Sequence, residues 1–209
     1  MPQSRQSRLK QAVAFLKAID SPTKELIQSV GECNYLLIGT PFYVLVKSVI
    51  GQQLSIQAAD AIQKRCFAYL NEGNVPKPRQ ILQAGEQDLR SCGLSRAKIA
   101  CLQNIASCYI VGSLADKELL QADKLFVSQK LLALKGIGPW TVEMVLIFAL
   151  DHWDIFSMGD LGLRRGIEKW YGIPREDKKS MQKFVKRFSP YQTILSWYLW
   201  TYDDKEPWE

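Results

Sequence analysis

The stretch Leu134-Lys135-Gly136-Ile137-Gly138-Pro139-Trp140-Thr141 lies between two segments whose apolar residues have helical spacing. Its two glycines allow a tight turn with outward-facing backbone N–H groups, because neither carries a Cβ that would block an approaching group. Pro139 suits the first turn of the next helix, and the positive end of that helix dipole attracts anions. The stretch therefore predicts a helix-hairpin-helix turn that binds phosphate through Gly136, Ile137, Gly138 and Thr141.

An isolated Gly-x-Gly is usually no more than a connection between two packed helices. Here Leu134 precedes the glycines and Ile137 lies between them, so both apolar side chains are expected to pin the turn to its helices. This context favours a phosphate-binding hairpin over a plain connection.

The composition is that of an ordinary globular protein. The chain has 209 residues, of which 47% are hydrophobic and 23% charged, enough for one core or for two small lobes. No apolar run reaches the length of a bilayer span and the N-terminus has no signal-peptide core, so we expect an intracellular protein without membrane contact. The net charge of +6 favours a polyanionic partner, but only weakly.

Cysteine and histidine usage excludes several kinds of site. The five cysteines are odd in number and form no close Cys-x-x-Cys pair, which argues against a zinc knuckle or a disulfide framework. We expect them to be reduced core residues. The single histidine, His152, removes most metal sites and most histidine-based catalytic schemes.

Helical spacing of apolar residues continues along the chain, and no alternating strand pattern of convincing length occurs. Helices are expected over residues 8–19, from Ser21-Pro22 with Ser21 as N-cap, from Pro41, after Ser55, and over 96–110, 160–171, 177–187 and 190–202. The predicted fold is all-α, with two helical lobes flanking a cleft. Residues 1–209 would form one domain, its central lobe covering about 41–135 and its other lobe built from both termini.

Two further turns carry polar or basic residues. Gly51-Gln52-Gln53-Leu54 joins two apolar helices through amides, where a structural loop more often has Asn, Asp or Ser, and a plain loop and a functional turn are both open readings. Ser95, Arg96 and Lys98 stand at another helix start. Cations there oppose the helix dipole unless an anion comes close, so phosphate binding and a solvated basic face are both open.

Asp160 is expected to be the N-cap of the helix that begins at Leu161. Capping and catalysis are compatible, because backbone N–H groups at a helix start hold a carboxylate ionised and aimed. Such a carboxylate is suited to face a developing cation.

Taken together, these motifs resemble the helix-hairpin-helix DNA glycosylases, and most nearly their alkylpurine or 3-methyladenine DNA glycosylase II branch. The resemblance covers roughly residues 36–202, and its most specific pieces are Gly51 to Ser55, Gly93 to Ser95, the hairpin and Gly159 to Gly162. It implies that Asp160 is the catalytic carboxylate and that Gln53, Leu54 and Ser55 form a wedge inserted into DNA. It also implies a monomer that flips a damaged nucleotide out of double-stranded DNA, in the nucleus of a eukaryote or the cytoplasm and nucleoid of a prokaryote.

The same resemblance bears on cofactors and strand cleavage. Bifunctional members of the superfamily have a lysine nucleophile two positions after the second hairpin glycine, where this chain has Trp140, so no lyase activity is expected. The iron–sulfur cluster of the endonuclease III relatives needs four C-terminal cysteines, and none follows Cys108. No cofactor is required, although the likeness implies a Na⁺ or K⁺ ion on the main-chain carbonyls of Leu132, Leu134 and Ile137.

The expected reaction is N-glycosyl hydrolysis in base excision repair. An alkylated purine such as 3-methyladenine or 7-methylguanine is cationic and leaves as a neutral base, so one carboxylate can suffice. Aromatic side chains would select the cationic base. The pocket candidates are Trp140, Met144, Tyr191 and Trp197, with core packing as the alternative role, and Arg164 is a further candidate for phosphate contact.

Two positions depart from the family's pattern. Ser157 stands where proline is common in the loop before Asp160, and Gln192 stands where an arginine is common. Either change would alter substrate range or weaken turnover without changing the fold. A weakly active or non-catalytic DNA-binding protein is therefore the alternative, and retention of Asp160 favours the enzyme.

Overall fold

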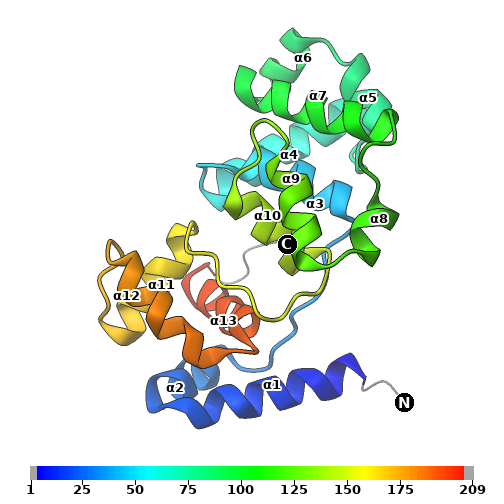
Figure 1. Ribbon diagram of the computed structural model, residues 1–209. Helices are drawn as coiled ribbons and strands as arrows, with labels where there is room; N and C mark the ends of the chain where they lie inside the picture. Colours follow the sequence, from blue (N-terminus) through cyan, green and yellow to red (C-terminus); the bar gives the residue numbers. More distant parts are fainter. Residues whose placement is uncertain (1–3, 205–209) are drawn as a thin grey trace. The chain divides into compact units, whose positions relative to one another are not determined.

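The computed structural model describes residues 4–204, and within them every regular element is a helix (Figure 1). The all-α fold and the helix-hairpin-helix turn predicted from the sequence are confirmed. The ends of the expected domain, residues 1–3 and 205–209, lie outside the described residues. The helices are α1 (Arg5–Ile19), α2 (Ser21–Val30), α3 (Pro41–Gly51), α4 (Ile56–Asn71), α5 (Pro78–Gln83), α6 (Glu86–Ser91), α7 (Arg96–Ile110), α8 (Asp116–Gln121), α9 (Lys124–Leu132), α10 (Pro139–Phe148), α11 (Leu161–Tyr171), α12 (Lys178–Val185), the 3-10 helix η1 (Lys186–Phe188) and α13 (Gln192–Asp204).

The chain forms two compact units. One is the continuous segment 38–150, and the other combines 4–37 with 151–204. The continuous unit extends past residue 135, where the sequence analysis ended the central lobe. It does so because α10 packs against α3 and α9.

The continuous unit is built around α3 and α10. Both helices are apolar on nearly all sides, so they fill the interior, and Leu45, Val49 and Val145 are fully buried. Helices α5 and α6 pack against α7, which in turn packs against α3.

A carboxylate on α8 holds the start of α3. Asp116 Oδ1 accepts hydrogen bonds from the backbone N–H of Phe42 (2.8 Å) and from the Tyr109 hydroxyl (2.6 Å). Burial and this carboxylate raise the pKa of Tyr109 far above its usual range. The hydroxyl therefore stays protonated as a donor.

We expect Asp116→Ala to lower the free energy of unfolding by about 1–3 kcal/mol, because it leaves two donors without their acceptor. Chemical denaturation measures the loss. Tyr109→Phe is the matched control and should cost less, because Asp116 keeps its bond to the α3 amide. An unchanged midpoint in Asp116→Ala would contradict the clamp.

The other unit joins both ends of the chain. Helix α2 packs against α13 and α1, and α11 packs against α13, with Leu16, Leu26 and Leu163 fully buried among them.

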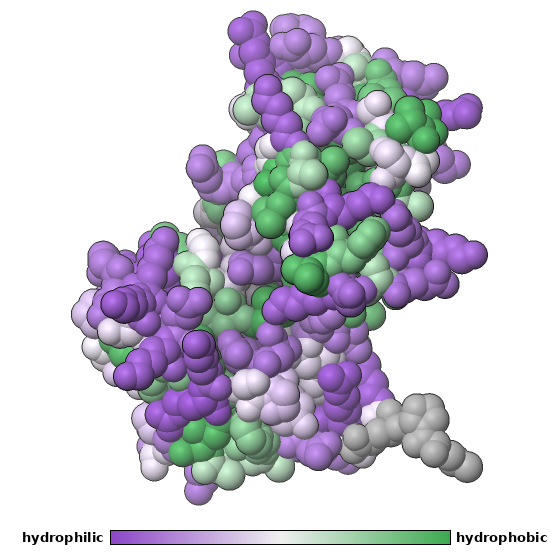
Figure 2. Space-filling view, viewed as in Figure 1, coloured by the Kyte–Doolittle hydropathy of each residue, from purple (hydrophilic) through white to green (hydrophobic). Residues whose placement is uncertain are grey.

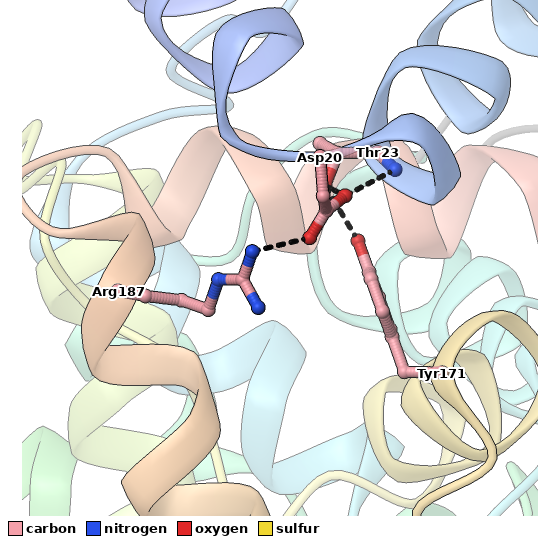
Figure 3. A network of polar contacts seen from close by, with 4 residues as sticks. All are labelled: Asp20, Thr23, Tyr171 and Arg187. Carbon is pink, nitrogen blue, oxygen red and sulfur yellow. Dashed lines mark hydrogen bonds and ion pairs between the residues drawn. The ribbon is translucent and has the colours of Figure 1, made fainter.

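A network of polar side chains connects the start of α2 to α11 and η1 in this unit (Figure 3). Asp20 Oδ2 pairs with the Arg187 guanidinium (2.7 Å), and Thr23 Oγ1 lies 2.8 Å from the Tyr171 hydroxyl. Burial raises the pKa of Tyr171 to about 12.

The predicted cap of α2 was wrong by one residue. The N-cap is Asp20, whose Oδ1 accepts from the Thr23 backbone N–H (2.8 Å), and Ser21 is already the first helical residue. Asp20 is favoured as the N-cap because one oxygen of its carboxylate caps the helix and the other binds Arg187.

The surface is mainly hydrophilic on the face shown in Figure 2, with scattered apolar patches. Within residues 4–204, no helix has both the length and the apolar character needed to cross a bilayer. The five cysteines are all free thiols, and the described residues contain no cluster of three or more potential metal ligands.

Candidate functional site

The hairpin occupies the turn between α9 and α10. Gly136 has φ +92°, a conformation that favours glycine, and a Cβ built there would lie 2.8 Å from Cys101 Sγ. Burial raises the pKa of the Cys101 thiol to about 11, so it remains a neutral packing group. Ile137 is 7% exposed and its N–H donates to the Leu134 carbonyl (3.1 Å). The contact of Gly136 with Cys101 and the burial of Ile137 thus hold the turn against the protein interior.

The second glycine of the hairpin is different. Gly138 is the N-cap of α10, with Pro139 as the first helical residue as predicted. Its backbone is extended, and a Cβ built there would meet no atom within 4 Å. The protein itself does not require glycine at this position, so the open space is available to an external group.

The turn between α3 and α4, residues 52–55, is tight and mostly exposed, and we call it the wedge turn. The Leu54 N–H donates to the Gly51 carbonyl (3.2 Å), and Ser55 caps α4 by accepting from the Ala58 N–H (3.3 Å). Gln53 has φ +58°, in the left-handed region, and Leu54 is 40% exposed. An apolar side chain is therefore held at the surface by ordered backbone.

Gln52 connects the wedge turn to the hairpin. Its Nε2 donates to the Gly136 carbonyl and to Thr141 Oγ1, both at 3.1 Å. Thr141 is 1% exposed, and its hydroxyl serves this internal bond. Sequence reasoning noted the amide of Gln52 within this turn but gave the residue no role of its own.

The start of α7 lies in the same unit. Ser95 is the N-cap and accepts from the Lys98 N–H (3.3 Å), and Arg96 pairs with Glu86 (3.2 Å) at the exposed surface. The Lys98 ammonium donates to the Ile50 carbonyl (2.7 Å) at the end of α3, and burial lowers its pKa. The Lys98 side chain therefore already has a protein partner, at the end of α3 next to the wedge turn.

Asp160 caps α11 in the other unit, as the sequence predicted. Its Oδ1 accepts from the Leu163 N–H (2.9 Å) and from Trp200 Nε1 (3.1 Å), so the carboxylate is oriented by two donors. Gly162 leaves room for this arrangement, because a Cβ there would lie 3.2 Å from Asp160 Oδ1. Trp200 was missed by sequence reasoning, since it has the spacing of a core residue on α13.

The remaining candidates in this unit have internal contacts. Tyr191 is half-buried and packs edge-on against Phe15 (5.3 Å between ring centroids) and Trp153 (6.2 Å). Trp197 is 8% exposed. The Arg164 guanidinium donates to the Arg175 carbonyl (2.8 Å).

The loop before Asp160 contains a buried serine. Ser157 is fully buried, and its carbonyl accepts from the Asp160 N–H (3.1 Å), which closes a turn just before α11. Gln192, the second departure from the family's pattern, is half-buried at the start of α13.

The pocket candidates fall into separate units. Trp140 is half-buried on the first turn of α10 and Met144 is fully buried on the same helix, whereas Tyr191 and Asp160 belong to the unit formed by both termini. The structure thus brings the hairpin, the wedge turn and the α7 start together in one unit, and Asp160, Arg164 and Tyr191 together in the other.

Comparison with known proteins identifies this arrangement. DNA-3-methyladenine glycosylase 1 of Schizosaccharomyces pombe is 34% identical over 201 residues, which cover 92% of this chain and 86% of that protein. A solved structure of the S. pombe enzyme Mag1 in complex with abasic DNA matches with a TM-score of 0.87 and 31% identity, covering 95% of this chain and 99% of the other. A Bacillus halodurans DNA-3-methyladenine glycosidase matches with a TM-score of 0.73 and 37% identity over 91% of this chain and 88% of its own.

The family model for "HhH-GPD superfamily base excision DNA repair protein" matches residues 46–190. That span includes the wedge turn, the hairpin and Asp160. With these three features in place and a relative that is 34% identical over 92% of the chain, the chain belongs to the HhH-GPD superfamily of base excision DNA repair proteins.

Proposed function

We propose that this protein is a monofunctional DNA glycosylase that excises cationic alkylated purines, such as 3-methyladenine or 7-methylguanine, from duplex DNA by base flipping. The observation that carries the proposal is the Asp160 carboxylate, held at the start of α11 by the Leu163 N–H and the Trp200 indole. The 3-methyladenine glycosylase names of the relatives support the substrate class.

Hydrolysis of a cationic purine nucleotide requires little more from the enzyme than one correctly oriented carboxylate. The bond between the sugar C1′ and the purine nitrogen breaks, and the cationic purine takes the electron pair and leaves as a neutral base. Asp160 stabilises the oxocarbenium-like sugar and orients the attacking water, whose oxygen bonds to C1′ while its proton passes to the carboxylate or solvent. Trp140 stands at the position of the lysine nucleophile in bifunctional relatives, so strand cleavage is not part of this activity.

Recognition is divided among the remaining groups. The N–H groups of Gly136, Gly138 and Thr141 bind a backbone phosphate, while the Ile137 N–H closes the turn by donating to Leu134, and the wedge turn enters the base stack. In the unit that carries Asp160, Tyr191 faces the flipped base, because an aromatic face favours a cation. Ser95, Arg96, Lys98 and Arg164 are secondary phosphate contacts, since the side chains of the three basic residues already have protein partners.

The catalytic steps assign no role to a cofactor. We propose in addition that the hairpin holds a structural Na⁺ or K⁺ ion. Leu132 ends α9, so its carbonyl lies at the negative end of the helix dipole, and the Leu134 carbonyl accepts one hydrogen bond, leaving its second lone pair for a cation. The Ile137 carbonyl completes the set. We propose further that the protein acts as a monomer in the compartment that holds the cell's DNA.

A base-release assay tests the function. Duplex DNA containing 3-methyladenine or 7-methylguanine is incubated with the protein, and the free base and any strand breaks are quantified separately. Release of the free base without strand cleavage supports a monofunctional glycosylase. Binding of the same duplex without release would instead show a non-catalytic member of the family.

The hairpin makes a separate prediction. Gly138→Val should weaken binding to all duplexes alike by roughly tenfold, because the added side chain occupies the open space through which a phosphate approaches. Fluorescence anisotropy on several undamaged sequences measures the effect. A changed sequence preference would contradict a phosphate contact.

The other hairpin glycine supplies the control. Gly136→Ala places a methyl against Cys101 and forces an unfavourable φ, so it should lower the melting temperature as well as binding. Gly138→Val should leave the melting temperature nearly unchanged.

A further inference from the structure

We propose that Gln52 is a positioning residue that couples the wedge turn to the hairpin, so that the phosphate bound by the hairpin sets how far Gln53 and Leu54 enter the DNA. This inference rests on the proposed function, which gives the two turns their separate contacts with DNA. It adds a mechanical link between them.

The first support is the geometry of the Gln52 side chain. Both of its bonds to the hairpin leave from one nitrogen, Nε2, which therefore commits its two hydrogens to Gly136 and Thr141. At its other end the Gln52 N–H donates to the Ser48 carbonyl of α3 (3.0 Å). The residue is thus fixed at both ends, and its peptide bond leads directly to Gln53.

The second support is the rigidity of the two groups that Gln52 contacts. Gly136 is held in its left-handed conformation against Cys101, and Thr141 is buried within α10. The position of the hairpin on a phosphate therefore sets the position of Gln52, because neither acceptor can rotate away from it.

Helix α7 supports both turns from one face. Lys98 binds the Ile50 carbonyl at the end of α3, and Cys101, three residues later, packs under Gly136. Residues three apart lie on the same side of a helix. The wedge turn and the hairpin therefore share one support, with Gln52 as the direct bond between them.

The test uses a readout that does not depend on catalysis. Duplexes carry 2-aminopurine next to an abasic-site analogue, so that fluorescence reports unstacking by the wedge while anisotropy reports binding. Gln52→Ala should bind undamaged duplex within about twofold of wild type, because the hairpin N–H groups remain. The fluorescence rise on binding the abasic duplex should fall to less than half.

A double-mutant cycle separates coupling from simple loss of stability. Leu54→Ala should lower the fluorescence rise strongly in wild type but little further in Gln52→Ala, because the wedge is already misplaced. Additive losses would overturn the proposal, as would an equal fall in binding and fluorescence. Gln87→Ala, an exposed glutamine on α6 of the same unit, is the matched control and should behave as wild type.

A second variant covers the case in which Gln52→Ala unfolds. Thr141→Val has nearly the same shape and removes one of the two acceptors, so it should give an intermediate fluorescence rise with the melting temperature close to that of wild type. A wild-type rise in Thr141→Val would overturn the coupling through this bond.

The experiments test the coupling and the proposed function separately. If wild type releases no alkylated base but the cycle is non-additive, the glycosylase proposal fails and the coupling stands. If base is released and the cycle is additive, the coupling alone fails.

Discussion

Asp160→Asn is expected to lower base release by at least about 100-fold while leaving DNA binding within about twofold, because the missing charge matters only as the sugar becomes cationic. The substitution is conservative for the fold. The asparagine carbonyl oxygen can still accept from the Leu163 N–H and from Trp200, so α11 keeps its cap. Single-turnover release of 7-methylguanine and anisotropy with an abasic duplex give the two quantities.

Asp177→Asn is the matched control for this experiment. Asp177 caps α12 in the same unit and accepts from the Ser180 N–H (3.0 Å), much as Asp160 caps α11. Asp177→Asn should therefore release base at the wild-type rate. Equal release by Asp160→Asn and wild type would refute the mechanism, whereas unfolding of Asp160→Asn alone would make Asp160 mainly a structural cap.

The second large effect is expected at the wedge turn. Gln53→Ala combined with Leu54→Ala should lower single-turnover excision from a fully paired duplex by about tenfold or more, because a filled gap recovers part of the few kcal/mol that flipping costs. The same lesion in a mismatched site is already partly open. The loss there should be no more than about threefold.

Gln53→Gly provides a control for the backbone of this turn. Gln53 has φ +58°, which glycine adopts more readily than glutamine or alanine, so the glycine variant removes the side chain without straining the turn. It should be at least as stable as wild type and still lose activity on paired duplex. Equal losses in paired and mismatched contexts would mean that these residues support the fold, and no loss in either would make the segment a plain interhelical loop.

Local chemistry explains which features were predictable from the sequence. The hairpin and the Asp160 cap depend on glycine conformation, proline at a helix start and a carboxylate next to N–H groups, all within a few residues. The all-α fold likewise follows from the spacing of apolar residues. These signals do not require knowledge of what the segment contacts.

The residues that were missed act across long distances in the chain. Trp200 reaches Asp160 from 40 residues away, and Gln52 reaches Gly136 from 84. On its own helix Trp200 has the spacing of a core residue, and only the packing of α13 against α11 brings its indole to the carboxylate. The misplaced cap of α2 has the same origin, since the second partner of Asp20 is the distant Arg187.

The division of the chain into a continuous and a discontinuous unit determines the order in which it can fold on the ribosome. Residues 38–150 are all synthesised before the segment that carries Asp160, so this unit can form while translation continues. Helices α1 and α2 are synthesised first. Their side chains Leu16 and Leu26 become buried only after α13 has been synthesised and packs against them. A nascent chain thus acquires its hairpin and wedge turn early and the folded unit around Asp160 last.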